Sequence, residues 1–140
     1  MTGTPSVLFV CVHNAGKSQL AAGLMKDLAG NAVEVHSAGT APSTAVNEQS
    51  AQSLAELGMD ITAERPKPIT AQLVRDVDVV VTLGLEAEVE QVEGTRFETW
   101  DTDEPSARGI EGMERMRLVR DDIAARVRAL AAELGVTGRS

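Results

Sequence analysis

The stretch that decides the fold is VLFVCVHNAGKSQL, residues 7–20. Its first four residues, Val7 to Val10, form an uninterrupted apolar run, which is typical of a strand buried on both faces. A short loop follows Cys11, and from Ser18 the apolar residues recur at helical spacing until Gly30. The stretch therefore predicts a strand, a tight loop and a helix in immediate succession.

Strand and helix patterns alternate along the rest of the chain. Small residues at 37–40 predict a turn after the second strand, and the regular spacing of apolar residues in the last helix ends at Gly135. This order predicts an α/β fold with a small four-stranded parallel sheet and helices on both faces, in one domain spanning residues 1–140. The further strands are expected at 33–36, 78–81 and 96–100, and the further helices at 44–57 and 113–134.

Composition and charge exclude several classes of protein. The chain carries 13 Lys and Arg against 21 Asp and Glu, and its net charge of −8 argues against a nucleic-acid partner. No apolar run approaches the roughly 20 residues that span a bilayer, and the first residues lack the pattern of a signal peptide, so we expect a cytoplasmic protein without a membrane partner. A single cysteine cannot form an internal disulfide, and no metal-binding motif is present.

The loop after the first strand has the composition of an oxyanion site. Ala15 and Gly16 allow close approach of the backbone, the following helix presents its positive end, and Lys17 adds a full charge. In that position Cys11 is expected to be a reactive thiolate, although a lone cysteine elsewhere usually packs as a small apolar residue. The predicted oxyanion-binding residues are Val12, His13, Asn14, Ala15, Gly16, Lys17 and Ser18, with Ser18 at the helix N-cap and His13 mainly packing the loop.

A nucleotide-binding loop is a rival interpretation of the same residues. The pattern G-x4-G-K-[ST] is met by Gly16, Lys17 and Ser18, but its first glycine is replaced by Cys11. The strand at 78–81 also runs into Thr82 rather than into the acidic residue that a magnesium site uses. Nucleotide binding therefore stays an alternative.

The stretch at 7–19 resembles the active-site signature of low-molecular-weight protein tyrosine phosphatases and the related thiol-linked arsenate reductases, V-L-F-V-C-x2-N-x2-R-S. Cys11, Asn14 and Ser18 match this signature, and the segments at 36–40 and 58–62 resemble two further blocks of the family. The resemblance covers nearly the whole chain. It implies a phosphatase-like fold in which Cys11 is the catalytic thiol of a phosphate-binding loop after the first strand.

Several residues place the resemblance nearer to arsenate reductases. Gln19 follows the signature as in those enzymes, and the chain has no Tyr to wall an aryl-phosphate pocket. Gly84 stands where the thioredoxin-coupled enzymes carry a second cysteine. The closest resemblance is to the single-cysteine arsenate–mycothiol transferases of actinobacteria, which share Lys17 and the segment at 112–117. It implies a role in arsenical resistance, arsenate or phosphate as ligand, no bound cofactor, mycothiol as the low-molecular-weight thiol co-substrate and a mycoredoxin-like redoxin downstream.

Two positions depart from the wider family. Lys17 stands in place of an arginine and lacks its planar two-bond grip on an oxyanion. Glu104 precedes Pro105 where the family has its general acid Asp; we expect Glu104 to be the proton donor, with Asp103 and Asp101 as alternatives. The remaining carboxylates between residues 86 and 104, and the mixed charges of the last helix, including Arg115 and Arg120, are interpreted as solvated surfaces.

The expected catalytic residues are thus Cys11, Lys17 and Glu104. Cys11 either forms a transient bond to arsenic or holds arsenate for attack by the small thiol. Two further functions stay open for the same site. One is hydrolysis of phosphate monoesters through a phosphorylated Cys11, and the other is an inactive oxyanion sensor.

Overall fold

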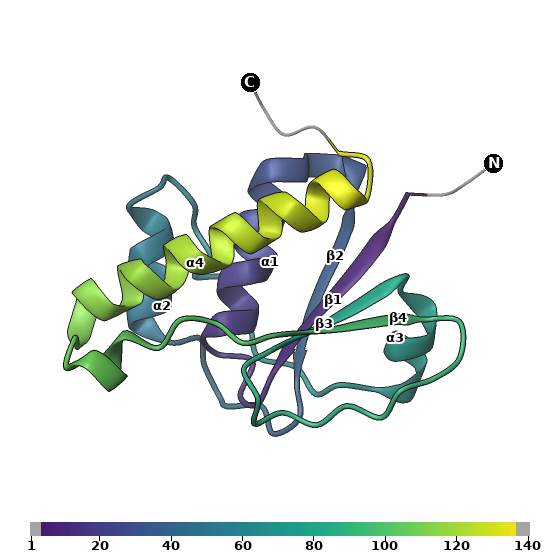
Figure 1. Ribbon diagram of the computed structural model, residues 1–140, viewed down its shortest axis with the longest axis horizontal. Coiled ribbons are helices and arrows are strands. Elements are labelled where there is room, and N and C mark those ends of the chain that lie inside the picture. The colour runs from purple at the N-terminus through teal and green to yellow at the C-terminus, as the bar shows by residue number, and fades with distance from the viewer. Residues whose placement is uncertain (1–3, 137–140) are drawn as a thin grey trace.

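The computed structural model describes residues 4–136 and contains a four-stranded, fully parallel sheet in the order β2-β1-β3-β4 (Figure 1). The predicted α/β class and parallel sheet are confirmed. Residues 1–3 and 137–140 of the predicted single domain lie outside the described residues, so that boundary stays a prediction. The strands are β1 (Ser6–Cys11), β2 (Glu34–Gly39), β3 (Val79–Leu83) and β4 (Arg96–Trp100).

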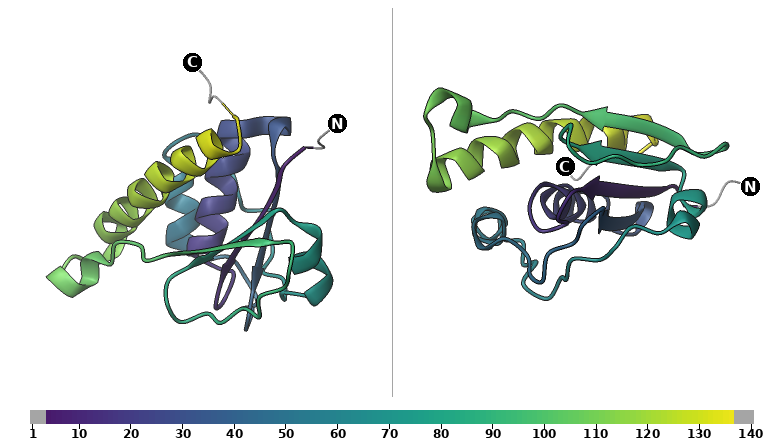
Figure 2. Two further views of the ribbon diagram at one scale, coloured as in Figure 1. Left: turned by 45° about the vertical axis from the view of Figure 1, so that its right-hand side comes forward. Right: turned by 90° about the horizontal axis from the view of Figure 1, so that it is seen from below.

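Helices cover both faces of this sheet. Figures 1 and 2 show α1, α2 and α4 on one side of the strands and the short α3 on the other. The helices are α1 (Lys17–Ala29), α2 (Glu48–Ala55), α3 (Ala71–Asp76) and α4 (Gly112–Glu133), and the 3₁₀ helices are η1 (Gly30–Ala32) and η2 (Pro105–Arg108).

The apolar run of β1 fills two cores at once. Val7 and Phe9 belong to the larger core under α1 and α4, while Leu8 and Val10 belong to the smaller core under α3. Phe9 packs against Trp100 of β4, with ring centroids 5.8 Å apart. Because successive side chains of a strand face opposite sides, a central strand covered by helices on both sides has no polar position.

Two predicted elements differ from the structure at their ends. β2 continues through Gly39, so residues 37–39 are strand rather than turn; they pair with residues 9–11 of β1. The helix expected at 44–57 begins only at Glu48, because Asn47 caps it by accepting a hydrogen bond from the Ser50 N–H at 3.0 Å.

α3 and η2 were not expected from the sequence. They have six and four residues, which is too short to show an apolar period. Within residues 4–136, no helix combines the length and the apolar character needed to cross a membrane.

Candidate active site

The loop 12–16 connects the carboxyl end of β1 to α1. Cys11 is the last residue of β1, and Gly16 precedes the first residue of α1, Lys17. Ser18 is therefore inside the first turn and is not the N-cap, which corrects the prediction. Its hydroxyl oxygen lies instead 2.9 Å from the sulfur of Cys11, in the buried interior.

Asn14 binds the same Ser18 hydroxyl. Its Nδ2 donates to the Ser18 hydroxyl at 2.7 Å, so the Ser18 oxygen accepts from Asn14 and its own proton is free to point to the Cys11 sulfur. Asn14 is fully buried, has a φ of 50°, and accepts at Oδ1 from the Lys67 N–H at 2.9 Å. A donor held at the sulfur stabilises negative charge there.

The carbonyl groups of the loop point away from the site. Three of them and the carbonyl of Cys11 accept hydrogen bonds from backbone N–H groups of the segment 40–47, while no N–H of residues 12–16 donates to another group within the described part of the chain. Because a trans peptide holds its N–H opposite its C=O, these N–H groups face the other side, as in an anion-binding nest. The four bonds are Thr40 to Cys11 (3.2 Å), Ala41 to Val12 (2.7 Å), Ser43 to His13 (2.9 Å) and Asn47 to Ala15 (2.7 Å).

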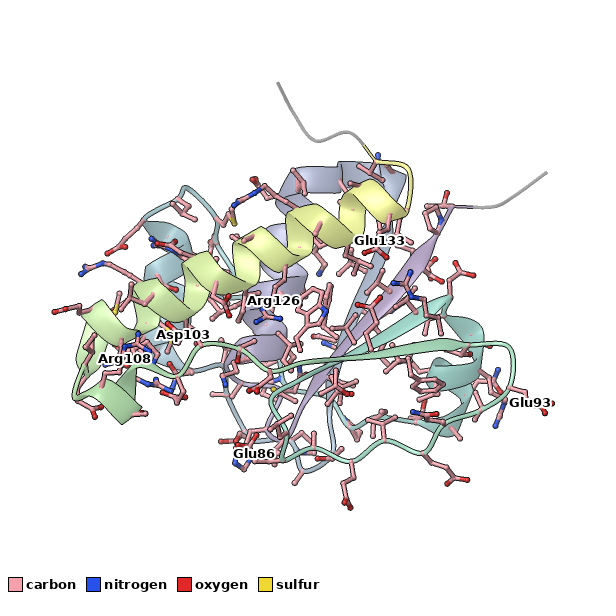
Figure 3. All side chains as sticks on the ribbon, viewed as in Figure 1. Glu86, Glu93, Asp103, Arg108, Arg126 and Glu133 are labelled. Atoms are coloured by element: carbon pink, nitrogen blue, oxygen red, sulfur yellow. The ribbon has the colours of Figure 1, made fainter. Side chains whose placement is uncertain are left out.

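A cavity of about 610 Å³ lies against the loop and Cys11. Its charged lining residues are Lys17, Glu86 and Arg115. Figure 3 shows Glu86 at the edge of the sheet where the loops gather. None of the described lining residues is Phe, Tyr or Trp. The lining residues are Cys11, Val12, His13, Ala15, Gly16, Lys17, Leu20, Ser43, Asn47, Ser50, Leu83, Glu86, Arg115, Met116 and Val119.

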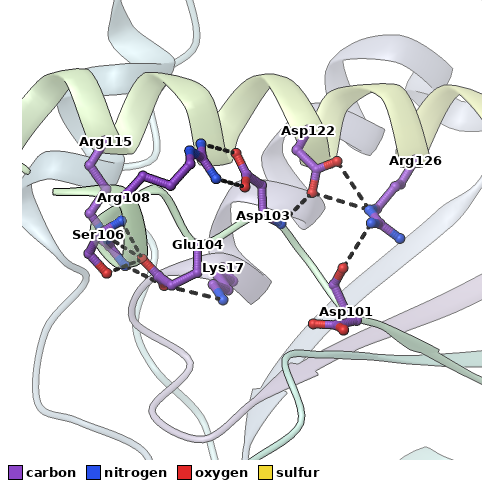
Figure 4. A network of polar contacts seen from close by, with 9 residues as sticks. All are labelled: Lys17, Asp101, Asp103, Glu104, Ser106, Arg108, Arg115, Asp122 and Arg126. Carbon is purple, nitrogen blue, oxygen red and sulfur yellow. Dashed lines mark hydrogen bonds and ion pairs between the residues drawn. The ribbon is translucent and has the colours of Figure 1, made fainter. Parts of the chain in front are cut away.

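The structure holds Glu104 beside the loop in its ionised form (Figure 4). Arg115 donates two hydrogen bonds of 2.8 Å to its two carboxylate oxygens, and Ser106 donates a third at 2.7 Å. These bonds, Arg115 first, lower the pKa of Glu104 from 4.5 to about 2. A proton-donor role therefore requires that Arg115 leave this carboxylate first, and the predicted role of Glu104 stays a prediction.

The two alternative acids, like Glu104 itself, are absent from the cavity lining. Arg108 binds the Asp103 carboxylate at 2.8 and 3.1 Å and lowers its pKa. Asp101 is exposed, and its backbone carbonyl accepts from Arg126 at 2.9 Å. Neither acid approaches the loop as Glu104 does, whose Oε1 lies 3.9 Å from the Lys17 ammonium.

The last helix corrects a second expectation. Arg115 is half-buried and lines the cavity, and Arg120 is buried, where it donates to the Ser53 carbonyl at 2.8 Å and to Glu56 at 2.9 Å. Neither arginine belongs to a plain solvated face. The sequence held no local signal for Arg115, because its neighbour Met116 packs on the core but adjacent residues of a helix do not share a face.

Polar cavity residues far along the chain were also missed, namely Ser43, Asn47, Ser50 and Glu86. Asn47 and Ser50 belong to the start of α2, and Ser43 and Glu86 belong to connecting segments, so only the tertiary fold brings them to the loop. Within residues 4–136, no group of three or more His, Cys, Asp or Glu side chains is arranged to hold a metal ion.

Comparisons with known proteins identify a family for this chain. The family model described as low molecular weight phosphotyrosine protein phosphatase matches residues 6–139. A glutaredoxin arsenate reductase from Synechocystis is 32% identical over 131 residues, which cover 91% of this chain and 97% of the relative.

Solved structures with a similar fold include arsenate reductases. A Corynebacterium glutamicum thioredoxin-dependent arsenate reductase has a TM-score of 0.82 and 33% identity over 96% of this chain, but the chain spans only 63% of that protein. An arsenate reductase in the phosphate binding state has a TM-score of 0.81 and 31% identity, over 93% of this chain and 98% of the other.

Proposed function

Since this chain belongs to the low molecular weight phosphotyrosine protein phosphatase family, we propose that it is an arsenate reductase that passes arsenate to an external low-molecular-weight thiol. One observation carries the proposal: Cys11, held by the Ser18 hydroxyl at the mouth of a loop with free N–H groups, is the only cysteine of the 140 residues. A lone thiol can bond to arsenic, but reduction by two electrons needs two thiols. At least one further thiol must therefore come from outside the chain.

The cavity favours a small inorganic oxyanion over an aryl phosphate. Its described lining has no aromatic side chain to stack on a phenol ring, and the loop offers backbone N–H groups and Lys17 to a compact anion. At about 610 Å³ it is also far larger than one arsenate ion, so a second ligand fits beside the oxyanion. Relatives named as arsenate reductases, one of them in a phosphate-binding state, support this choice.

The proposed reaction begins at Cys11. Its thiolate displaces one oxygen of arsenate, which takes up protons and leaves as water, and a sulfur–arsenic bond forms. The sulfur of the external thiol then displaces Cys11, whose thiolate is regenerated, while the thiol proton passes to solvent. Arsenic is still As(V) in the released thiol–arsenate adduct.

Reduction follows on a separate redoxin. A thiol of the redoxin attacks the sulfur of the adduct, the two thiols become a mixed disulfide, and the two electrons released reduce As(V) to arsenite. The resemblance of the 112–117 segment and Lys17 favours mycothiol and a mycoredoxin-like protein as these two partners.

Mass spectrometry of the reaction mixture tests the proposal. The protein is incubated with arsenate and either mycothiol or glutathione, and both the protein and the small molecules are analysed. We expect a thiol–arsenate adduct with mycothiol for the wild type and none for Cys11→Ser. No adduct with either thiol from a folded wild-type protein, or an equal yield from Cys11→Ser, contradicts the proposal; hydrolysis of an aryl phosphate by the wild type alone would favour the phosphatase alternative.

A further inference from the structure

One carboxylate oxygen lies between two cations at the cavity. Glu104 Oε1 accepts a hydrogen bond of 2.8 Å from Arg115 Nη2 and lies 3.9 Å from Lys17 Nζ. Figure 4 shows Lys17 reaching this carboxylate from α1 and Arg115 reaching it from α4. Both cations line the cavity beside Cys11, whereas Glu104 is not among the lining residues. Glu104 thus pairs with the two cations, Lys17 and Arg115, that would otherwise be available to an anion bound in the cavity.

The loop itself has no planar cation. Lys17 provides a compact point charge, which does not form the two parallel hydrogen bonds that a guanidinium makes to a tetrahedral oxyanion. Arg115 is the only guanidinium among the described lining residues, and it already makes a two-bond contact to a carboxylate of similar geometry. A fork of this kind binds arsenate or phosphate without rearrangement of its own atoms.

We propose that Arg115 of α4 is an oxyanion-binding residue, released from Glu104 when arsenate enters the loop. The inference rests on the proposed function only in that the ligand is a tetrahedral oxyanion. Ligand and Glu104 compete for the same guanidinium, so Glu104 acts as an internal anion that keeps Arg115 in place at the empty site. Position 17 of the loop is Lys and has no guanidinium. Arg115 supplies one from α4, more than ninety residues further along the chain.

The exchange also frees Glu104. Arg115 is the first cause of its lowered pKa, so loss of that contact moves the pKa of the carboxyl back towards 4.5. Ser106 still holds Oε2 through its hydroxyl at 2.7 Å, which keeps the carboxyl near the loop. The same movement that places Arg115 on the oxyanion therefore makes Glu104 a better proton acceptor and donor.

A purely structural clamp predicts something different. If the pair only fastened the segment before η2 to α4, removal of either partner would loosen the same segment and change oxyanion binding in the same direction. Under the proposal the two partners act oppositely, because Arg115 attracts the ligand while Glu104 competes with it. The signs of the two effects therefore separate the two roles.

The experiment measures Kd for inorganic phosphate and for arsenate by titration calorimetry. The variants are Arg115→Ala, Arg115→Lys, Glu104→Gln and the double variant Arg115→Ala/Glu104→Gln, each checked for folding by its melting curve. Arg117→Ala is the matched control, because Arg117 lies on the same helix but pairs with Glu56 outside the cavity lining.

We expect Arg115→Ala to raise both Kd values by about tenfold or more, and Arg115→Lys to recover part of this loss. Glu104→Gln lowers Kd in the wild-type background, and that gain becomes smaller when Arg115 is already Ala, because Glu104 then competes with the ligand only for Lys17. Arg117→Ala keeps the wild-type Kd. Arsenate turnover is expected to show a raised KM in Arg115→Ala.

Three results overturn the inference: an unchanged Kd in a folded Arg115→Ala, weaker binding in Glu104→Gln, or a gain from Glu104→Gln that is as large without Arg115 as with it. The failure of the proposed function looks different. In that case the wild type itself binds no oxyanion, or it binds the oxyanion and forms no thiol adduct.

Discussion

The hydroxyl oxygen of Ser18 lies 2.9 Å from the sulfur of Cys11, although the two residues are seven apart in the chain. Cys11 is the last residue of β1 and Ser18 lies in the first turn of α1. The tight loop 12–16, which contains Asn14, brings the two side chains together. Asn14 donates to the same hydroxyl, which leaves the Ser18 proton available to the sulfur. The contact couples the thiol of Cys11 to the loop that is proposed to hold the oxyanion.

Replacement of Ser18 by Ala tests this contact. It removes the donor to the thiolate, so we expect alkylation of Cys11 by iodoacetamide at neutral pH to slow by roughly tenfold, since a hydrogen bond to a charged group contributes about 1.5–3 kcal/mol. Ser53→Ala is the control, because Ser53 is as buried but donates to the Ser50 carbonyl in α2. Equal alkylation rates for Ser18→Ala and wild type would show that the hydroxyl does not stabilise the sulfur anion.

Asn14 is expected to shape the loop through both its backbone and its side chain. Asn14→Ala loses the bonds to Ser18 and Lys67, and Ala tolerates a φ of 50° less well than Asn, so the free energy of unfolding should fall by about 2–4 kcal/mol. Asn14→Gly loses the same bonds but tolerates the backbone, so it should be about 1 kcal/mol more stable than the Ala variant. Urea unfolding measures the free energy of unfolding of both variants. If Asn14→Ala is as stable as Asn14→Gly, the backbone conformation of residue 14 does not contribute as predicted.

Gly39 lets β2 pass directly under the loop. A β-carbon there would lie 2.7 Å from the Val12 carbonyl oxygen and 2.9 Å from the Asn14 nitrogen, and both neighbours are backbone that cannot rotate away. We expect Gly39→Ala to displace the loop and to weaken phosphate binding at least about tenfold, because misplaced N–H groups lose their hydrogen bonds to the anion. Calorimetry gives the affinity and circular dichroism reports the fold; a folded variant with wild-type affinity would refute the prediction.

Acid should weaken the fold through two carboxylates in particular. The pKa values of Glu56 and Glu104 are both lowered from 4.5 to about 2 by their arginine partners. A lowered pKa means that the folded state binds protons less readily than the unfolded state, so these pairs stabilise the fold above pH 4.5 and lose that effect as the pH falls towards 2. Both side chains are partly exposed, so each contribution is modest.

The variant Glu56→Gln/Glu104→Gln should therefore melt at a lower temperature than wild type at neutral pH, and the difference should shrink as the pH falls through this window. Glu90→Gln serves as control, because Glu90 is exposed and forms no ion pair within the described residues. A melting-temperature difference that stays constant down to about pH 2 would be incompatible with these lowered pKa values.

Much of the fold follows from local patterns in the sequence. The apolar run at 7–10, the periodic helix after 112 and the strand at 96–100 are confirmed because each is buried on a face that its own residues define. The ends of β2 and α2 were wrong because they depend on tertiary partners: residues 37–39 become strand only by pairing with β1, and Asn47 starts α2 while its N–H bonds the loop at Ala15.

The site divides in the same way. Cys11 and the loop are contiguous, so composition and a resemblance were enough to find them. Arg115 was not found, because nothing local distinguishes an arginine that faces a cavity from one that faces water. Its partner Glu104 lies eleven residues earlier in the chain. Only the tertiary fold brings Glu104 into contact with both Arg115 and Lys17.

The most direct measurement is arsenite release in a coupled assay that contains arsenate, mycothiol, a mycoredoxin and its reductase system, run beside a thioredoxin system without mycothiol. The wild type should release arsenite only where the small thiol is present, and Cys11→Ser should release none, because the one thiol of the chain cannot complete a two-electron reduction alone. Arsenite release with thioredoxin alone, or full activity in Cys11→Ser, would contradict a single-cysteine enzyme that depends on a borrowed thiol.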